Sequence, residues 1–173
     1  MKFLRTVIVL VILFPLLFTN SCKVKYGFTG GRKFDDSVTV SVMTFTNSAP
    51  LAKATFPQSF SEAIRDAIQR QTRLKTIPRN GDLNFEGSIT GYSVVPVSIQ
   101  GGGTNEASLN RLTVTVSVKY TDAIEEQYSF ESSFSRYADF PSSQNLSAVE
   151  DQLLKDISDQ LVQDIMNRSI NAW

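Results

Sequence analysis

The strict alternation of apolar and polar residues from Arg111 to Tyr120 constrains the fold more than any other feature. The apolar positions are Leu112, Val114, Val116, Val118 and Tyr120. Successive side chains of a β-strand point to opposite faces, so the stretch predicts a strand with one buried face and one polar face. Similar alternation at 38–45, 83–92 and 128–134 predicts further strands, and the short polar loop 121–126 predicts an antiparallel hairpin.

Two segments with helical spacing are predicted to cover the apolar face of this sheet. Phe60, Ile64 and Ile68 recur every four residues after Pro57. The second stripe consists of Val149, Leu153, Ile157, Leu161 and Ile165. Ser147 and Glu150 stand at capping-box spacing, which predicts that the second helix begins at Ser147. The order of elements predicts an α+β fold: a two-layer sandwich with a four- to five-stranded mixed or antiparallel sheet and two amphipathic helices on one face.

The N-terminal residues predict a signal peptide at 1–21. Lys2 and Arg5 precede an apolar run at 7–18, which is shorter than the ~20 residues of a membrane-spanning helix. The run ends shortly before Cys22, the only cysteine. This arrangement resembles bacterial lipoprotein signals, in which that cysteine becomes the diacylated first residue, and we therefore predict lipidation at Cys22. The alternative is an ordinary signal peptide followed by an incidental cysteine.

The rest of the chain is predicted to form a lipidated tether at 22–36 and a single α+β domain at 37–173. Lys23 follows the cysteine, and no acidic cluster comes after it. Lipoprotein sorting rules, carried over by resemblance, then imply anchoring at the periplasmic face of the outer membrane. Two of the 17 basic residues, Lys2 and Arg5, leave with the signal, so 15 remain against 17 acidic residues.

The composition excludes several classes of function. The chain has no histidine, which removes Ser-His-Asp and Cys-His catalysis and His-ligated zinc. Adjacent carboxylates at 35–36 and 125–126 lie in predicted turns, where solvation is the simpler interpretation. Equal numbers of basic and acidic residues do not fit nucleic acid as the main partner. We therefore predict no enzymatic activity, no cofactor, no metal and no nucleic-acid partner.

Charged residues are segregated along the chain. Within 65–79, five basic residues accompany the single acidic Asp66, and they are Arg65, Arg70, Arg73, Lys75 and Arg79. Acidic residues dominate 139–164. A basic patch at a membrane can bind lipid phosphates through charge-assisted hydrogen bonds, which makes these five residues candidates for lipid-phosphate binding. The alternative is a pair of solvated helix faces that partly neutralise each other.

Together these features resemble a known family, the lipopolysaccharide-assembly lipoproteins LptE. The resemblance lies in the signal ending at Cys22 and in Tyr-Gly-Phe-Thr-Gly at 26–30, Phe-Glu-Gly-Ser-Ile-Thr-Gly-Tyr at 85–92, Asn-Arg-Leu-Thr-Val-Thr-Val-Ser-Val-Lys-Tyr at 110–120 and Phe-Ser-Arg-Tyr-Ala-Asp-Phe at 134–140. It implies a sheet with two helices that plugs the outer-membrane β-barrel LptD and assists its assembly. It also implies lipopolysaccharide as the cargo, delivered to the cell surface without catalysis.

Other classes of lipoprotein share part of the pattern. A Val-rich strand, a Phe-Thr-Asn turn and an Ala/Ile helix at 38–68 also suit a periplasmic lipoprotein that regulates cell-wall synthesis or forms a homo-oligomeric secretion channel. A glycan-binding lipoprotein is a further alternative, although Trp173 is the only tryptophan available for stacking on sugars. The partner distinguishes these hypotheses: a barrel, a cell-wall synthase or a ring of identical copies.

Overall fold

The computed structural model describes residues 32, 34–98 and 108–171. The predicted signal peptide, Cys22, residues 23–31 and 33 of the predicted tether and the glycine-rich residues 101–103 lie outside the described residues. The elements are β1 (Thr39–Val42), β2 (Thr46–Asn47), α2 (Phe56–Gln71), β3 (Lys75–Ile77), β4 (Leu83–Ser98), β5 (Ser108–Asp122), a 3₁₀ turn η2 (Glu126–Tyr128), β6 (Phe130–Pro141) and α3 (Leu146–Arg168).

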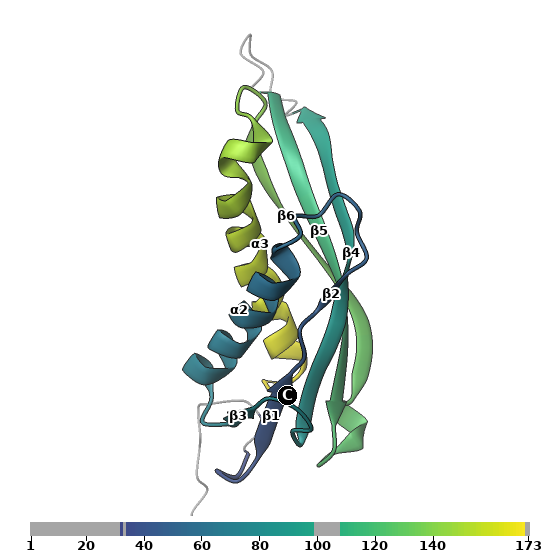
Figure 1. Ribbon diagram of the computed structural model, residues 1–173, viewed down its shortest axis with the longest axis vertical. Coiled ribbons are helices and arrows are strands. Elements are labelled where there is room, and N and C mark those ends of the chain that lie inside the picture. The colour runs from purple at the N-terminus through teal and green to yellow at the C-terminus, as the bar shows by residue number, and fades with distance from the viewer. Residues whose placement is uncertain (1–31, 33, 99–107, 172–173) are drawn as a thin grey trace, which may run out of the picture. The chain divides into compact units, whose positions relative to one another are not determined.

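The sheet is mixed and follows the order β3-β1-β4-β5-β6, with the two-residue β2 also pairing with β4. Strands β4, β5 and β6 form an antiparallel meander, whereas β1 runs parallel to both β3 and β4. Both helices lie on one face of the sheet (Figure 1). The predicted α+β architecture is confirmed, with short β2 raising the number of strands to six.

The core lies between the helices and the inner face of the sheet. The alternating residues of β5 are inaccessible to solvent on the predicted side, from Leu112 to Tyr120. Helix α2 buries Phe60, Ile64 and Ile68, and α3 buries Ile157, Leu161 and Ile165, as their spacing predicts. The predicted capping box of α3 is wrong. Asn145 caps the helix instead, because its extended backbone lets Oδ1 accept a hydrogen bond from the N–H of Ser147.

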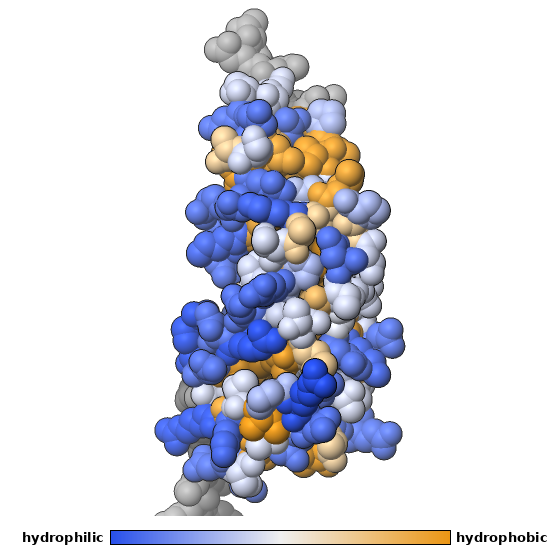
Figure 2. Space-filling view, viewed as in Figure 1, coloured by the Kyte–Doolittle hydropathy of each residue, from blue (hydrophilic) through white to orange (hydrophobic). Residues whose placement is uncertain are grey.

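Strand β4 contains a bulge that changes which residues face the core. Register with β5 shifts between Ile89 and Gly91, so the odd-numbered inward positions become even-numbered ones beyond it. Beyond Tyr92, where the predicted strand ends, β4 continues to Ser98. Beyond the reach of β1 and β2, Val94 is 39% exposed and Val95 46% exposed. Figure 2 shows apolar side chains at the surface near the C-terminal end of β4.

The outer face of the sheet is polar and not covered by either helix. Ser88, Ser117 and Ser133 stand in register across β4, β5 and β6. Four charged residues of this face form two ion pairs. Lys119 Nζ lies 2.8 Å from a carboxylate oxygen of Glu86. Arg111 donates hydrogen bonds to both carboxylate oxygens of its cross-strand neighbour Asp139. The face is therefore nearly neutral.

Candidate functional site

The five basic residues predicted from the sequence do not share one pocket. Arg65 lies on α2, where its Nη2 donates a hydrogen bond of 2.8 Å to the carbonyl of Val42. It lines a hollow of about 380 Å³ together with Val42, Gln69, Thr76, Ile77 and Pro78. The hydroxyl of Thr76 is buried there without a partner among the described residues. One guanidinium nitrogen of Arg65 is used in the hydrogen bond to Val42, and the remaining donors are suitable chemistry for an anion.

Arg70 points elsewhere, into a groove between α2 and α3. The groove has a volume of about 730 Å³ and mixed charge. Its lysines are paired: Lys53 with Asp151 at 2.5 Å, and Lys155 with Asp159 at 3.0 Å. Arg70 Nη1 lies 3.9 Å from Asp66. Because each cation in the groove has a carboxylate close by, the groove does not favour a phosphate.

The remaining three predicted residues lie around the short edge strand β3. Lys75 is the first residue of β3 and is exposed, and Arg79 follows the strand at the surface. Arg73 lines a separate pocket of about 250 Å³ that also contains Asp35 and Asp36. Within the described ranges, none of these three or Arg65 forms an ion pair within 4.0 Å. The unpaired part of the predicted patch thus lies along α2, β3 and the adjoining turns, without Arg70.

The acidic segment predicted at 139–164 is largely neutralised by residues that are distant in sequence. Asp164 on α3 accepts two hydrogen bonds from Arg136 on β6, at 2.6 and 2.7 Å. Glu150 at the start of α3 accepts a hydrogen bond from the Tyr92 hydroxyl at 2.6 Å. Asp151 on α3 pairs with Lys53, Asp139 on β6 pairs with Arg111 on β5, and Asp159 pairs with Lys155 on α3 itself. The contacts of Asp164, Glu150 and Asp151 therefore fasten α3 to its neighbours.

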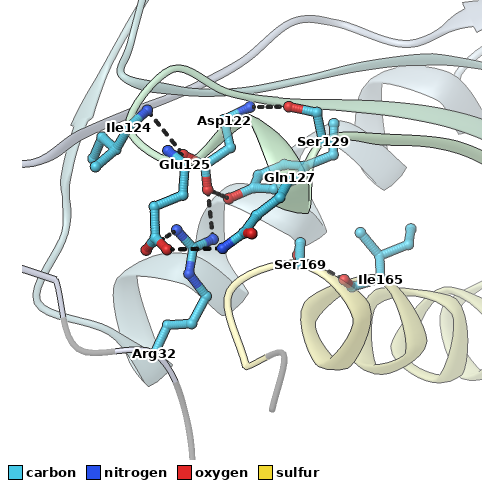
Figure 3. A network of polar contacts seen from close by, with 9 residues as sticks. Arg32, Asp122, Ile124, Glu125, Gln127, Ser129, Ile165 and Ser169 are labelled. Atoms are coloured by element: carbon cyan, nitrogen blue, oxygen red, sulfur yellow. Dashed lines mark hydrogen bonds and ion pairs between the residues drawn. The ribbon is translucent and has the colours of Figure 1, made fainter.

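A buried arginine at the start of the described chain is a feature that the sequence patterns do not predict. The side chain of Arg32 is 6% exposed, and its Nη1 binds Asp122, which is fully buried, at 2.5 Å (Figure 3). Its Nη2 binds Glu125 at 3.0 Å. Its guanidinium carbon lies 4.0 Å from the ring centroid of Tyr128 and 4.7 Å from that of Phe34. Two carboxylates and two aromatic rings therefore surround one cation.

The carboxylate of this cluster is positioned by its own turn. Asp122 Oδ1 accepts hydrogen bonds from the backbone N–H groups of Ile124 and Glu125, and Oδ2 accepts one from the Tyr120 hydroxyl. Burial alone would raise the pKa of Asp122, but the hydrogen bonds from Arg32 and the backbone lower it overall. Burial also raises the pKa of Tyr120, so its hydroxyl stays protonated and donates. We name Asp122, Glu125, Phe34 and Tyr128 the Arg32 socket.

The sequence contains one signal for this socket. Asp122 falls on the inward side of the alternation that begins at Leu112, and a buried carboxylate requires a cation or several donors. Nothing local indicates which cation, because Arg32 lies 90 residues away. Elsewhere among the described residues, no group of three or more Cys, Asp or Glu is arranged to hold a metal ion. Neither described helix has the length and apolar composition of a membrane span.

Comparison with known proteins identifies the family. Residues 37–169 match the family LptE, described as Lipopolysaccharide-assembly. The chain belongs to the LptE family. No curated protein matches the chain. It is thus one of the lipopolysaccharide-assembly lipoproteins. The matched range contains every described helix and strand.

Solved structures resemble this LptE-family chain in fold. The hypothetical protein CT253 from Chlamydia trachomatis is 13% identical over 76% of this chain and 94% of that chain, with a TM-score of 0.52. A minor lipoprotein from Acinetobacter baumannii is 12% identical over 75% and 90%, with a TM-score of 0.47. The PelC dodecamer from Paraburkholderia phytofirmans is 11% identical over 82% and 96%, also with a TM-score of 0.47. At 13% identity, the likeness to CT253 concerns the fold alone.

Proposed function

We propose that this protein is an outer-membrane lipoprotein, anchored through Cys22 at the periplasmic face, that plugs an LptD-type β-barrel and assists its assembly. The match of residues 37–169 to the LptE family carries the proposal. The dimensions of the sheet support it. The 16 residues of β4 extend over about 50 Å at ~3.3 Å per residue, which is comparable to the 40–45 Å of a whole bilayer.

The uncovered sheet face also suits this role. The interior of a large outer-membrane barrel is polar, and the hydroxyl-bearing outer face of β4, β5 and β6 can meet such a wall with Lys119 and Arg111 already paired to carboxylates. The protein then acts by fitting its partner and not by catalysis. Delivery of lipopolysaccharide to the cell surface is the activity of the complex.

Crosslinking in intact cells followed by affinity purification tests the partnership. We expect a large β-barrel in the purified complex. A chain recovered from native membranes without any barrel would contradict the plug. A matched Cys22→Ala variant, expressed at the same level and labelled with radioactive palmitate, tests the anchor separately, and incorporation equal to that of the unaltered protein would rule it out.

We further propose that Arg65, Arg73, Lys75 and Arg79 contact lipid phosphates, and that Arg70 does not. The support is the absence of ion pairs at these four residues within the described chain, together with the hollow beside Arg65. Arg65→Gln should weaken binding of lipopolysaccharide, whereas the control Arg70→Gln, on the same helix, should not. Equal binding by the two variants, or unchanged binding after the lipid is dephosphorylated, would refute the assignment.

A further inference from the structure

The C-terminal half of β4 is an unpaired edge of the described sheet. Strand β1 pairs with β4 only as far as Phe85, and β2 pairs only at Ser88 and Ile89. Beyond the bulge, β4 continues to Ser98 with β5 as its one described neighbour (Figure 1). No backbone hydrogen bond joins residues 91–98 to a described residue outside β5. We call this side of residues 91–98 the free edge.

Hydrogen bonds at the neighbouring strands identify which backbone groups face the free edge. The carbonyl of Ser108 on β5 accepts a hydrogen bond from the N–H of Ser142, which follows β6. Backbone orientation alternates along an antiparallel strand, so the even-numbered residues of β5 are turned toward β6, and their partners on β4 are turned toward the free edge. These partners are Tyr92, Val94, Pro96 and Ser98. Pro96 has no N–H, and at the free edge this loss breaks no hydrogen bond of the sheet.

The free edge lacks the charged residues that usually protect a strand edge from association. At the opposite edge, β6 carries three exposed charged residues, Glu131, Arg136 and Asp139. The short edge strand β3 begins with the exposed Lys75. Residues 91–98 contain no charged side chain, and Val94 and Val95 are exposed on opposite faces of the strand. The free edge is therefore suited to pairing with another uncharged strand.

The apolar residues of the free edge are arranged symmetrically about Val95. In an antiparallel pair of two copies centred on this residue, each Val95 faces the Val95 of the other copy, and each Val94 lies opposite Pro96. The N–H of Val94 then donates to the carbonyl of Pro96 in the second copy. A pair centred on Val94 instead would place Val95 opposite Ser93. The register centred on Val95 thus buries apolar residues against one another and opposes no like charges.

We propose that two copies of this chain pair antiparallel along residues 92–98 of β4, with Val95 at the two-fold axis. Such an interface is isologous, because the same strand edge serves both copies. It is smaller than the ~1,200 Å² of a standard stable interface, so the dimer is weak and depends on concentration. The inference goes beyond the proposed function and does not rest on the barrel, since it describes the chain free of other proteins.

Disulfide trapping tests the register. The full-length protein is purified in detergent without other proteins and oxidised, and the unaltered protein treated alike measures any contribution of Cys22. Val95→Cys places two cysteines directly opposite each other with Cα atoms about 4.5 Å apart, which a disulfide can bridge. The matched control is Val94→Cys on the same edge, where the two cysteines are diagonal neighbours about 7–8 Å apart. We expect several-fold more linked dimer with Val95→Cys, and equal or greater linkage with Val94→Cys would overturn the proposal.

Charge substitutions at the axis test the dimer itself by sedimentation equilibrium. Val95→Lys and Val95→Glu each oppose like charges and should give monomers, whereas a mixture of the two variants opposes Lys to Glu and should restore dimers. Val95 is exposed, so neither change is expected to prevent folding. Ile124→Lys, at a similarly exposed position in the turn after β5, should dimerise like the unaltered protein.

Three outcomes of the sedimentation experiment would overturn the proposal. They are an unaltered protein that stays monomeric up to about 1 mM, a concentration chosen for a weak dimer, dimers that survive both charged substitutions, and a mixture that remains monomeric. Because these samples contain no barrel, the results are independent of the crosslinking result with LptD.

Discussion

Replacing Arg32 with methionine should destabilise the domain substantially. The change leaves Asp122 buried without its cation and removes the group between Phe34 and Tyr128. Removing one partner of a buried ion pair costs about 3–5 kcal/mol. We place this case at about 3 kcal/mol, because the backbone and Tyr120 still donate hydrogen bonds to Asp122. For a domain of this size the change corresponds to a fall in Tm of about 10 °C.

Urea denaturation of the lipid-free chain, with residues 1–21 removed and Cys22 replaced by serine, measures this loss. Arg136→Met is the matched control. Arg136 also forms two hydrogen bonds with a carboxylate, that of Asp164, but its side chain is 46% exposed, so its loss should cost much less. Adding Asp122→Asn to Arg32→Met should restore part of the stability, because it removes the unpaired charge. A cost for Arg32→Met no greater than that for Arg136→Met would refute the reasoning.

The remaining predictions concern the same carboxylate and the packing of the core. Asp122→Asn should make the stability of the protein less sensitive to acid. Because the pKa of Asp122 is lower in the folded state than its unfolded value of about 3.9, the ionised carboxylate stabilises the fold above about pH 3.9, and this stabilisation is lost as the pH falls through the folded pKa. Acid titration followed by circular dichroism measures the difference. Gly87→Ala should cost at least about 2 kcal/mol by urea denaturation, because its Cβ would stand 2.1 Å from the carbonyl oxygen of Ser117, whereas Gly91→Ala, with a nearest approach of 3.0 Å, should cost less. Ile157→Ala should cost about 2–5 kcal/mol in the same assay, since the side chain is fully buried. This cost corresponds to a fall of several degrees in Tm, and a Tm within about 2 °C of the unaltered protein would contradict the place of Ile157 in the core.

Much of the fold is predictable because its signals are local. The alternation in β5 and the four-residue spacing in α2 and α3 identify each element and its buried face. The parallel position of β1 between β3 and β4 is not predictable in this way, because it depends on pairing between segments separated by a whole helix. The bulge near Thr90 is also hidden, since an alternating sequence does not reveal where register with a neighbour shifts.

In the candidate site, too, the local sequence predicts where charged residues cluster but not which of them pair. Counting charges along the chain identifies the basic segment at 65–79, but the pairing of those charges depends on residues elsewhere. The sequence places Arg70 with the other basic residues, and only the packing of α2 on α3 separates it from them. Likewise, the position of Arg32 in a socket 90 residues away cannot be read from its neighbours in the tether.

The paired charges on the outer sheet face have a consequence for the kinetics of association. A face whose Lys119 and Arg111 are neutralised by neighbouring carboxylates exerts little long-range attraction, so a partner that docks there should associate at a rate nearly independent of ionic strength. A negatively charged partner that approaches the unpaired arginines and lysine around β3 should associate more slowly as salt is added. The salt dependence of the association rate therefore reports which of the two surfaces a partner meets first.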